Sequence, residues 1–168
     1  MESNADMLKK TITVEIGDAK MSSDVTRILA TYSLGSCIGV CLYCSANQVG
    51  GMLHYLLPDS SMNPKRAQEN PFLYADTGMK VLLEALAEKG IKKNQIKVTV
   101  AGGAQRLKVT AEGFDIGKRN YLAIRKILWK NGMFINSEDV GGDRPRTLYM
   151  GIADGSVIIK SDGFEKCV

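Results

Sequence analysis

Short apolar segments, several of them alternating with polar residues, run through most of the chain. A period of two, as in TITVEI, places every second side chain on one face and is typical of a half-buried strand. Two continuous apolar runs, 37–44 and 50–57, are separated by the short polar stretch SANQV and predict neighbouring strands of a hairpin. The full set of predicted strands is 11–16, 25–32, 37–44, 50–57, 96–101, 133–137, 147–152 and 156–159.

Two further segments carry the helical period instead. Apolar residues recur at intervals of three and four within 72–89 and predict one buried stripe, made of Tyr74, Gly78, Val81, Leu82, Ala85 and Leu86. A second helix is predicted over 118–130, with Tyr121, Ile124 and Leu128 on its buried face. Gly90 and Gly132 follow the two segments and are suited to end them.

The order of these elements predicts the fold class. Strands cluster in runs instead of alternating with helices, which favours an α+β fold with helices packed on a mixed or antiparallel sheet. Segments 17–24 and 58–71 are predicted as loops. A chain of 168 residues can bury a core of its own. We therefore expect a single domain over 11–168, preceded by a flexible polar arm over 1–10.

Composition and charge restrict the class of function. The net charge of +4 is modest, and basic residues do not interleave with aromatic ones as in a nucleic-acid surface. No apolar run approaches the ~20 residues that a membrane helix needs. The first residues, MESNADMLKK, lack the apolar segment of a secretory signal. We expect a cytoplasmic protein that does not insert into membranes and whose cysteines are reduced.

The stretch from 30 to 58 holds the residues with the strongest chemical potential. It contains the chain's only histidine, His54, and three of its four cysteines. Cys37 lies at the head of one predicted strand and His54 within the next, so the two side chains can meet in space. A thiol beside an imidazole is the arrangement of a cysteine nucleophile with its acid–base partner, in which an imidazolium lowers the pKa of the thiol.

The residues before Cys37 add to this hypothesis. Gly35 and Ser36 are suited to a sharp turn that exposes the sulfur and leaves backbone N–H groups free to bind an oxyanion. Thr31 ends the preceding strand, and its hydroxyl can orient an imidazole by a hydrogen bond. The sequence thus predicts a site made of Cys37, His54 and Thr31, with Gly35 and Ser36 shaping the oxyanion turn.

Two alternative interpretations stay open on the residues alone. Cysteine is among the most buried residue types, so Cys37 and His54 can belong to the core without any catalytic role. Alternatively, Cys37, Cys41 and Cys44 have the spacing C-x₃-C-x₂-C, which resembles the iron–sulfur motif of radical S-adenosylmethionine enzymes. In a strand, however, Cys44 faces away from the other two cysteines, because successive side chains alternate.

A longer series of motifs, in a fixed order, resembles one protein family. The series is Thr31-x-x-Leu34-Gly35-Ser36-Cys37, Gly51-Met52-x-His54-x-x-Leu57-Pro58-Asp59-Ser60, Tyr74-Ala75-Asp76-Thr77, Ala101-Gly102-Gly103-Ala104, Ile116-Gly117-x-Arg119-Asn120 and Gly141-Gly142-Asp143-Arg144-x-Arg146. It covers roughly residues 11–160 and resembles the CheD family of chemoreceptor glutamine deamidases. The chain departs from the family pattern at Tyr32 and Ser33, in the turn before Leu34, and in the extra cysteines Cys41 and Cys44. These departures leave Cys37 and His54 intact.

This resemblance implies a function. It implies a protein-glutamine glutaminase that hydrolyses glutamine side chains of methyl-accepting chemotaxis receptors to glutamate and ammonia. The family's nucleophile falls on Cys37, its histidine on His54 and its orienting threonine on Thr31. No metal or organic cofactor is implied. The resemblance also implies a layered α/β/β sandwich with two main helices, similar to toxin-type cysteine deamidases, and for some members a CheC-type phosphatase as partner.

Two other classes of function are compatible with these residues. A regulatory binding module would dock on a CheC-type phosphatase and modulate it. Another thiol acyl-transfer enzyme, such as a peptidase or a transglutaminase, would cleave peptides or incorporate amines instead of releasing ammonia.

Overall fold

The strands form two sheets of five strands each in the computed structural model, which describes residues 9–105 and 115–168. The outer sheet has the order β1 (Thr11–Thr13), β3 (Ile28–Leu34), β8 (Arg146–Gly151), β9 (Val157–Ser161) and β10 (Phe164–Cys167). The inner sheet has the order β2 (Asp18–Ser22), β5 (Val49–Tyr55), β4 (Ile38–Cys44), β6 (Lys97–Gly102) and β7 (Ser137–Val140). Both sheets are mixed, because β1–β3 and β6–β7 pair in parallel and the other neighbours are antiparallel.

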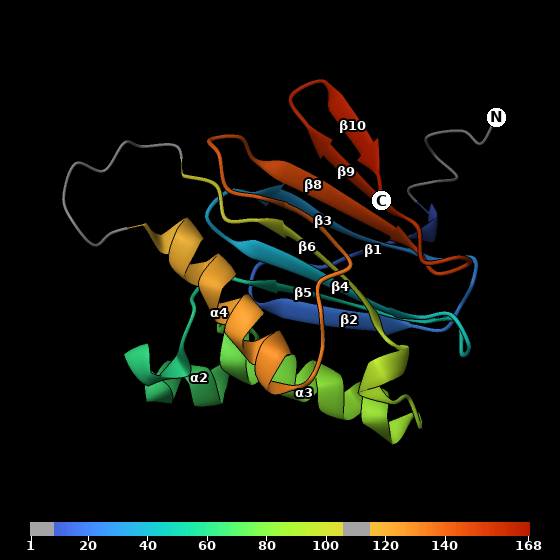
Figure 1. Ribbon diagram of the computed structural model, residues 1–168, viewed down its shortest axis with the longest axis horizontal. Coiled ribbons are helices and arrows are strands. Elements are labelled where there is room, and N and C mark those ends of the chain that lie inside the picture. The colour runs from blue at the N-terminus through green and yellow to red at the C-terminus, as the bar shows by residue number, and fades with distance from the viewer. Residues whose placement is uncertain (1–8, 106–114) are drawn as a thin grey trace.

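Two long helices, α3 (Ala75–Glu88) and α4 (Ile116–Lys130), pack on the inner sheet. The short helix α2 (Pro64–Glu69) and three single turns of 3₁₀-helix lie in the connections: η1 (Ser60–Met62), η2 (Pro71–Leu73) and η3 (Lys93–Gln95). Figure 1 shows the helices below, the inner sheet in the middle and the outer sheet above. The expected α+β class is therefore confirmed.

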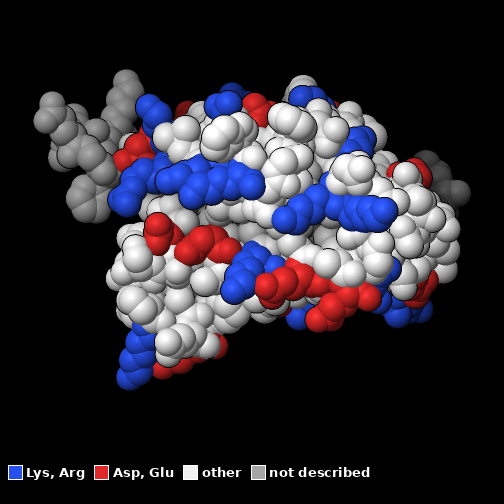
Figure 2. All heavy atoms as spheres, turned by 60° about the horizontal axis from the view of Figure 1, so that its bottom comes forward, with Lys and Arg blue, Asp and Glu red and all other residues white. Residues whose placement is uncertain are grey.

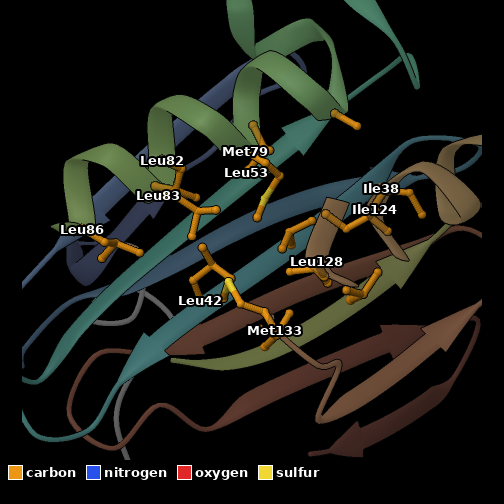
Figure 3. Packing of buried hydrophobic residues seen from close by; sticks show 14 of the residues in the cluster. Ile38, Leu42, Leu53, Met79, Leu82, Leu83, Leu86, Ile124, Leu128 and Met133 are labelled. Atoms are coloured by element: carbon orange, nitrogen blue, oxygen red, sulfur yellow. The ribbon is translucent and has the colours of Figure 1, made fainter. Parts of the chain in front are cut away.

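The inner sheet is covered on both faces, which explains the unbroken apolar runs of β4 and β5. Every residue of these two strands is buried. Figure 3 shows the helix-facing side, where side chains of α3 and α4 point onto those of the sheet. The labelled members of this core are Ile38, Leu42, Leu53, Met79, Leu82, Leu83, Leu86, Ile124, Leu128 and Met133.

A second core fills the space between the two sheets. Cys37 and Cys41 belong to it, together with residues of β3, β8 and β9. Cys44 belongs instead to the core beneath the helices. The three thiols therefore lie on opposite faces of the inner sheet and do not converge on one point, as the strand alternation predicts.

Three elements lie outside the predicted set. Strand β2 occupies part of the predicted loop 17–24. It is the edge strand of the inner sheet, and its polar sequence DAKMS is held by backbone pairing with its neighbour β5. Helix α2 lies within the predicted loop 58–71. It starts with Pro64 at a position where a missing N–H costs nothing, and the Asn63 side chain caps it. Strand β10 is fully exposed and has no apolar alternation to reveal it.

Other predicted elements are present with shifted bounds. The helix expected over 72–89 begins at Ala75, because Pro71–Leu73 form a 3₁₀ turn. Its buried stripe includes Met79 and Leu83, whereas Val81 is 36% exposed. The strand expected over 133–137 is wrong for residues 133–136, which are not part of a strand, and β7 begins only at Ser137. The hairpin β4–β5 is confirmed, and the strands expected over 147–152 and 156–159 are present as β8 and β9.

No helix in the described ranges is long and apolar enough to span a membrane. The expected flexible arm falls mainly on residues 1–8, which lie outside the described ranges.

Candidate active site

Cys37 lies directly before β4, at the end of the bend formed by Gly35 and Ser36. Its side chain is only 7% exposed and faces the layer between the two sheets. The predicted turn is therefore present, but the sulfur is largely covered instead of standing free in solvent.

His54 lies on the neighbouring strand β5 and faces the same layer. Its direct cross-strand partner is Gly39 of β4, and Gly39 shares a face with Cys37 because side chains alternate along the strand. Cys37 and His54 are thus diagonal neighbours, a relation that puts the Cβ atoms of two strand residues about 7–8 Å apart or slightly closer. The structure brings the two predicted residues together on one face.

Thr31 reaches His54 from the opposite sheet. Its Oγ1 lies 2.7 Å from His54 Nδ1 and also 2.7 Å from the carbonyl oxygen of Val14. A hydroxyl has one hydrogen, and the Val14 carbonyl can only accept it. Thr31 therefore donates to Val14 and accepts from His54, which places the imidazole proton on Nδ1.

This tautomer leaves Nε2 of His54 without a proton. Nε2 is buried and has no hydrogen-bond partner among the residues that the structure describes. A buried nitrogen with a free lone pair is costly unless it is used. It can act as a base toward a proton on the same face, where Cys37 and Cys41 both carry thiols.

Burial sets the charge state of the pair. It lowers the pKa of His54 to about 4 and raises the pKa of the Cys37 thiol. Both shifts have the same cause, because a low-dielectric site disfavours the charged form of either group. The expected imidazolium–thiolate pair is therefore not the favoured resting state. At neutral pH the two groups are a neutral thiol and a neutral imidazole.

Gly39 allows the two sheets to approach at this point. A Cβ atom at position 39 would lie 2.7 Å from Leu148 Cδ1 and 3.0 Å from Leu34 Cδ1 of the outer sheet. It would also touch the Thr31 methyl group, at 3.5 Å. The missing side chain thus lets the outer sheet come close enough for Thr31 to bond His54.

The backbone around Cys37 is held by three hydrogen bonds to its carbonyl groups. Gly35 O accepts from Ala104 N and Cys37 O from Gly103 N, each at 2.8 Å. Ser36 O accepts from the side chain of Asn120 at 2.9 Å. Gly102 has φ +113° and its missing Cβ would collide with the Cys37 carbonyl, so this approach requires glycine.

With the carbonyls engaged, the N–H groups of the bend remain for a ligand. Within residues 9–105 and 115–168, the Ser36 N–H donates to no protein group. The Cys37 N–H lies against its own sulfur, where it works to lower the pKa of the thiol, against the larger effect of burial. Two adjacent amides beside a nucleophile have the composition of an oxyanion hole.

Asn120 of α4 is the residue that sequence reasoning did not assign to the site. It is fully buried, and its Nδ2 donates to Ser36 O and to Leu56 O, each at 2.9 Å. Both partners are carbonyl oxygens, so the nitrogen must face them. The main-chain carbonyl oxygen of Asn120 accepts a hydrogen bond from Tyr55 Oη at 2.6 Å. The side-chain amide of Asn120 therefore joins Ser36, the residue before Cys37, to Leu56, two positions after His54.

A signal for Asn120 exists in the sequence. It lies four residues before Ile124 and eight before Leu128, on the buried face of α4. An asparagine at a core position of a helix needs buried partners, because an unpaired amide there is costly. The predicted buried face began with Tyr121, which is only half-buried.

Comparison with known proteins gave consistent matches. The family model described as CheD chemotactic sensory transduction matches residues 56–161. A Solibacter usitatus protein named "Probable chemoreceptor glutamine deamidase CheD" is 44% identical over 155 residues, 92% of this chain and 91% of its own. A Syntrophus aciditrophicus protein named "Probable chemoreceptor glutamine deamidase CheD 1" is 44% identical over 152 residues, 90% and 94% of the two chains.

The family model and the full-length relatives differ in whether their matches include residues 31–54, which contain Thr31, Cys37 and His54. The family model begins after His54, whereas an alignment over 92% of the chain must span residues 31–54. Among solved structures, a Neisseria meningitidis protein of family DUF152 covers 79% of this chain and 62% of its own, with 11% identity and a TM-score of 0.44.

Proposed function

Because the chain belongs to the CheD family, we infer that it is a chemoreceptor glutamine deamidase, an amidohydrolase that converts glutamine side chains of chemotaxis receptors to glutamate and ammonia. We propose that Cys37 is its nucleophile and His54 its acid–base group. The observation that carries this assignment is the Thr31 hydroxyl. It accepts from His54 Nδ1 and thereby leaves Nε2 free, on the face of the sheet that Cys37 shares.

In the first step, His54 Nε2 takes the thiol proton while Cys37 Sγ attacks the carbonyl carbon of the glutamine side chain. A C–S bond forms, and the electron pair of the C=O bond moves to oxygen. The Ser36 and Cys37 N–H groups stabilise this oxyanion. Deprotonation during attack fits a thiol whose pKa is raised by burial, because no thiolate has to be present beforehand.

In the second step, Nε2–H protonates the departing nitrogen, the C–N bond breaks, and ammonia leaves a thioester behind. Nε2 then takes a proton from water, and the resulting hydroxide attacks the thioester. The C–S bond breaks and the sulfur regains its proton from Nε2–H. The product is glutamate. These steps use only groups of this chain and water.

Asn120 is proposed as a positioning residue for this mechanism. Its bridge between Ser36 O and Leu56 O sets the distance between the oxyanion bend and the strand that carries His54. Its Oδ1 is buried and accepts no hydrogen bond from the described part of the chain. The amide thus contributes through the two donor contacts, which fix backbone atoms on both sides of the reacting groups.

The assignment is tested by incubating a chemoreceptor cytoplasmic domain with the protein and measuring Gln-to-Glu mass shifts and ammonia. Wild type, Cys37→Ala and Cys41→Ala are compared. Cys41 is the matched control, because it is a buried thiol on the same face of the inner sheet, four residues further along the chain. The shift should occur with wild type and Cys41→Ala and be absent with Cys37→Ala. Activity in Cys37→Ala would contradict the assignment.

Finer features of the assignment are proposals of the same kind. We propose that residues 11–168 form one catalytic domain of the α/β/β type found in toxin-type cysteine deamidases, with 1–10 as an arm. We also propose a cytoplasmic location, where receptor signalling helices lie. A CheC-type phosphatase is proposed as a regulatory partner, and co-purification of the two proteins would test it.

A further inference from the structure

Helix α4 presents an exposed face that no other described element covers. Its exposed residues recur at intervals of three and four and therefore lie on one side of the helix: Lys118, Arg119, Leu122, Arg125, Lys126, Trp129 and Lys130. The helix contains five basic residues and no acidic one, in the sequence IGKRNYLAIRKILWK. This composition is unusual for a solvated helix, where mixed charges normally stabilise each other at intervals of four.

Large apolar side chains lie among these cations. Trp129, the chain's only tryptophan, is 75% exposed, and Phe134, just after the helix, is 78% exposed. A groove of about 500 Å³ runs beside them, with Tyr121, Arg125 and Glu138 among the residues around it. Exposed aromatic rings next to arginine are the side chains that most often anchor protein–protein contacts.

The cations of α4 are available for a partner. Within the described ranges none of them forms a salt bridge, although Arg125 lies over the Tyr121 ring, 5.7 Å from its centroid. Figure 2 turns the helical layer toward the viewer and shows a row of Lys and Arg side chains above a row of acidic ones. Most basic side chains therefore gather on one side of this face, although a basic group also lies within the acidic row.

The same helix begins at the proposed active site. Asn120 bonds the carbonyl of Ser36, the residue before the nucleophile. At 1.5 Å per residue, Trp129 lies about 14 Å further along the helix axis. A standard interface covers about 800 Å² on each partner, which is wide enough to include both positions.

We propose that the exposed face of α4, together with Phe134, is the docking surface for the protein substrate. The occupant is an acidic, amphipathic helical segment of the chemoreceptor. Its apolar side chains would pack against Trp129 and Phe134, and its carboxylates would face the five cations. The proposal rests on the deamidase function inferred above. Its consequence is that substrate affinity and chemistry reside on separate parts of the molecule.

A nucleic acid fits this surface less well. Helix α3 packs against α4 and carries Glu84 and Glu88, which would repel a phosphate backbone lying across the two helices. An acidic helix needs only a narrow strip, about 10–12 Å wide with its side chains, and can stay on α4.

The test compares steady-state deamidation of a receptor cytoplasmic domain by wild type, Trp129→Ala and the double variant Lys126→Glu/Lys130→Glu. The matched control is Phe164→Ala, because Phe164 of β10 is also a well-exposed aromatic residue, at 57%, but lies on the outer sheet. A second readout is the rate of Cys37 alkylation by iodoacetamide, followed by peptide mass mapping because Cys167 is also exposed.

Both α4 variants should raise KM about tenfold or more, while kcat and the Cys37 alkylation rate stay within twofold of wild type. Added salt should raise KM of wild type more than that of the double variant, because screening removes the same attraction. Phe164→Ala should behave as wild type.

Three results would overturn the proposal: an unchanged KM in the α4 variants, an equal rise in Phe164→Ala, or a fall in the alkylation rate. Competition by duplex DNA but not by an acidic peptide would also contradict it. An inactive wild type would instead refute the deamidase function, so the two failures are distinguishable.

Discussion

Cys37 and Cys41 lie on the same face of the inner sheet, yet one stands at the mouth of the layer between the sheets and the other in its interior. Cys41 is enclosed by packed side chains, and burial raises the pKa of its thiol to about 12. Cys37 is also buried, but it follows a bend in which the Ser36 N–H donates to no group within residues 9–105 and 115–168 and whose carbonyls are held by distant residues. The difference shows that the position in the backbone, more than the thiol itself, makes a candidate nucleophile.

Substitution of the two thiols gives the largest expected contrast. Cys37→Ala should lower kcat by about 10⁴-fold or more, because it removes the proposed nucleophile that forms the thioester. Cys41→Ala should keep kcat within about twofold and lose about 1–2 kcal/mol of stability to a small cavity. Ammonia release and thermal unfolding measure both effects. Equal activity of the two variants would remove the distinction between the two environments.

Loss of the base comes next. His54→Ala should lower kcat by about 10²–10⁴-fold, the usual contribution of a general acid–base group. Thr31 keeps its bond to Val14 in this variant, so the outer sheet should remain in place. Thermal unfolding within a few degrees of wild type, together with the rate loss, would support a chemical role. Wild-type kcat in His54→Ala would show that another group moves the proton.

Asn120 tests whether the bend depends on its distant supports. Asn120→Ala should lower kcat about 10–100-fold and cost about 1–3 kcal/mol of stability, because two buried carbonyl groups lose their donor. The matched control is Asn136→Ala. The side chain of Asn136 also bonds a distant strand, accepting from Val98 N at 2.7 Å. Val98, however, lies at the start of β6, away from the end at Gly102 that contacts Cys37.

A merely structural role for Asn120 would lower stability in both asparagine variants and leave their kinetics alike. A positioning role would also slow Cys37 alkylation in Asn120→Ala at every pH, and Asn136→Ala would not share this effect.

Thr31 should have a smaller effect, because its proposed role is to orient the imidazole without moving protons itself. Thr31→Val keeps the shape but removes the hydroxyl, and we expect kcat to fall about tenfold, the value of one hydrogen bond. Thr31→Ser retains the hydroxyl and should restore most of the rate. If Thr31→Val is as inactive as His54→Ala, the hydroxyl does more than fix the tautomer.

The dependence on pH is the mildest test. Because burial lowers the pKa of His54 to about 4, the imidazole stays neutral between pH 6.5 and 4, and kcat/KM should fall only as pH drops toward 4. Alkylation of Cys37 should rise about tenfold per pH unit between pH 6 and 8, since its pKa is raised. An alkylation rate that stays level over this range would indicate a thiolate–imidazolium pair.

The same shift makes a prediction for stability. The unfolded chain binds a proton at its one histidine below about pH 6.5, whereas the folded chain does so only near pH 4. Stability therefore falls as pH drops through this window, and His54→Gln should flatten that part of the curve.

The sequence was informative where the chemistry is local. The apolar runs predicted the β4–β5 hairpin, and its register explains why Cys37 and His54 share a face. Features that depend on distant partners could not be read in this way. Asn120 is 84 residues from Ser36, and Val14 enters the site only through its main-chain oxygen. The directions of the pKa shifts of Cys37 and His54 could not be read for the same reason, because burial between two sheets is a property of the assembled layers.

Strand β2 illustrates the same limit in the fold. Its five residues, DAKMS, carry no apolar alternation, and only pairing with β5 makes them a strand. Helix α2 begins with Pro64, and a proline in a polar segment is also typical of a loop, so the sequence alone did not distinguish the two.

The acceptor for the Thr31 hydroxyl has an evolutionary consequence. A side chain in this role could be lost by a single substitution, whereas the carbonyl of Val14 is present whatever amino acid occupies the position. The position of the imidazole proton is thus determined by where the main chain of Val14 lies and not by its side chain. A mutational scan should find position 14 tolerant of any apolar residue that fits the core, although an atom of that residue helps to decide which nitrogen of His54 is basic.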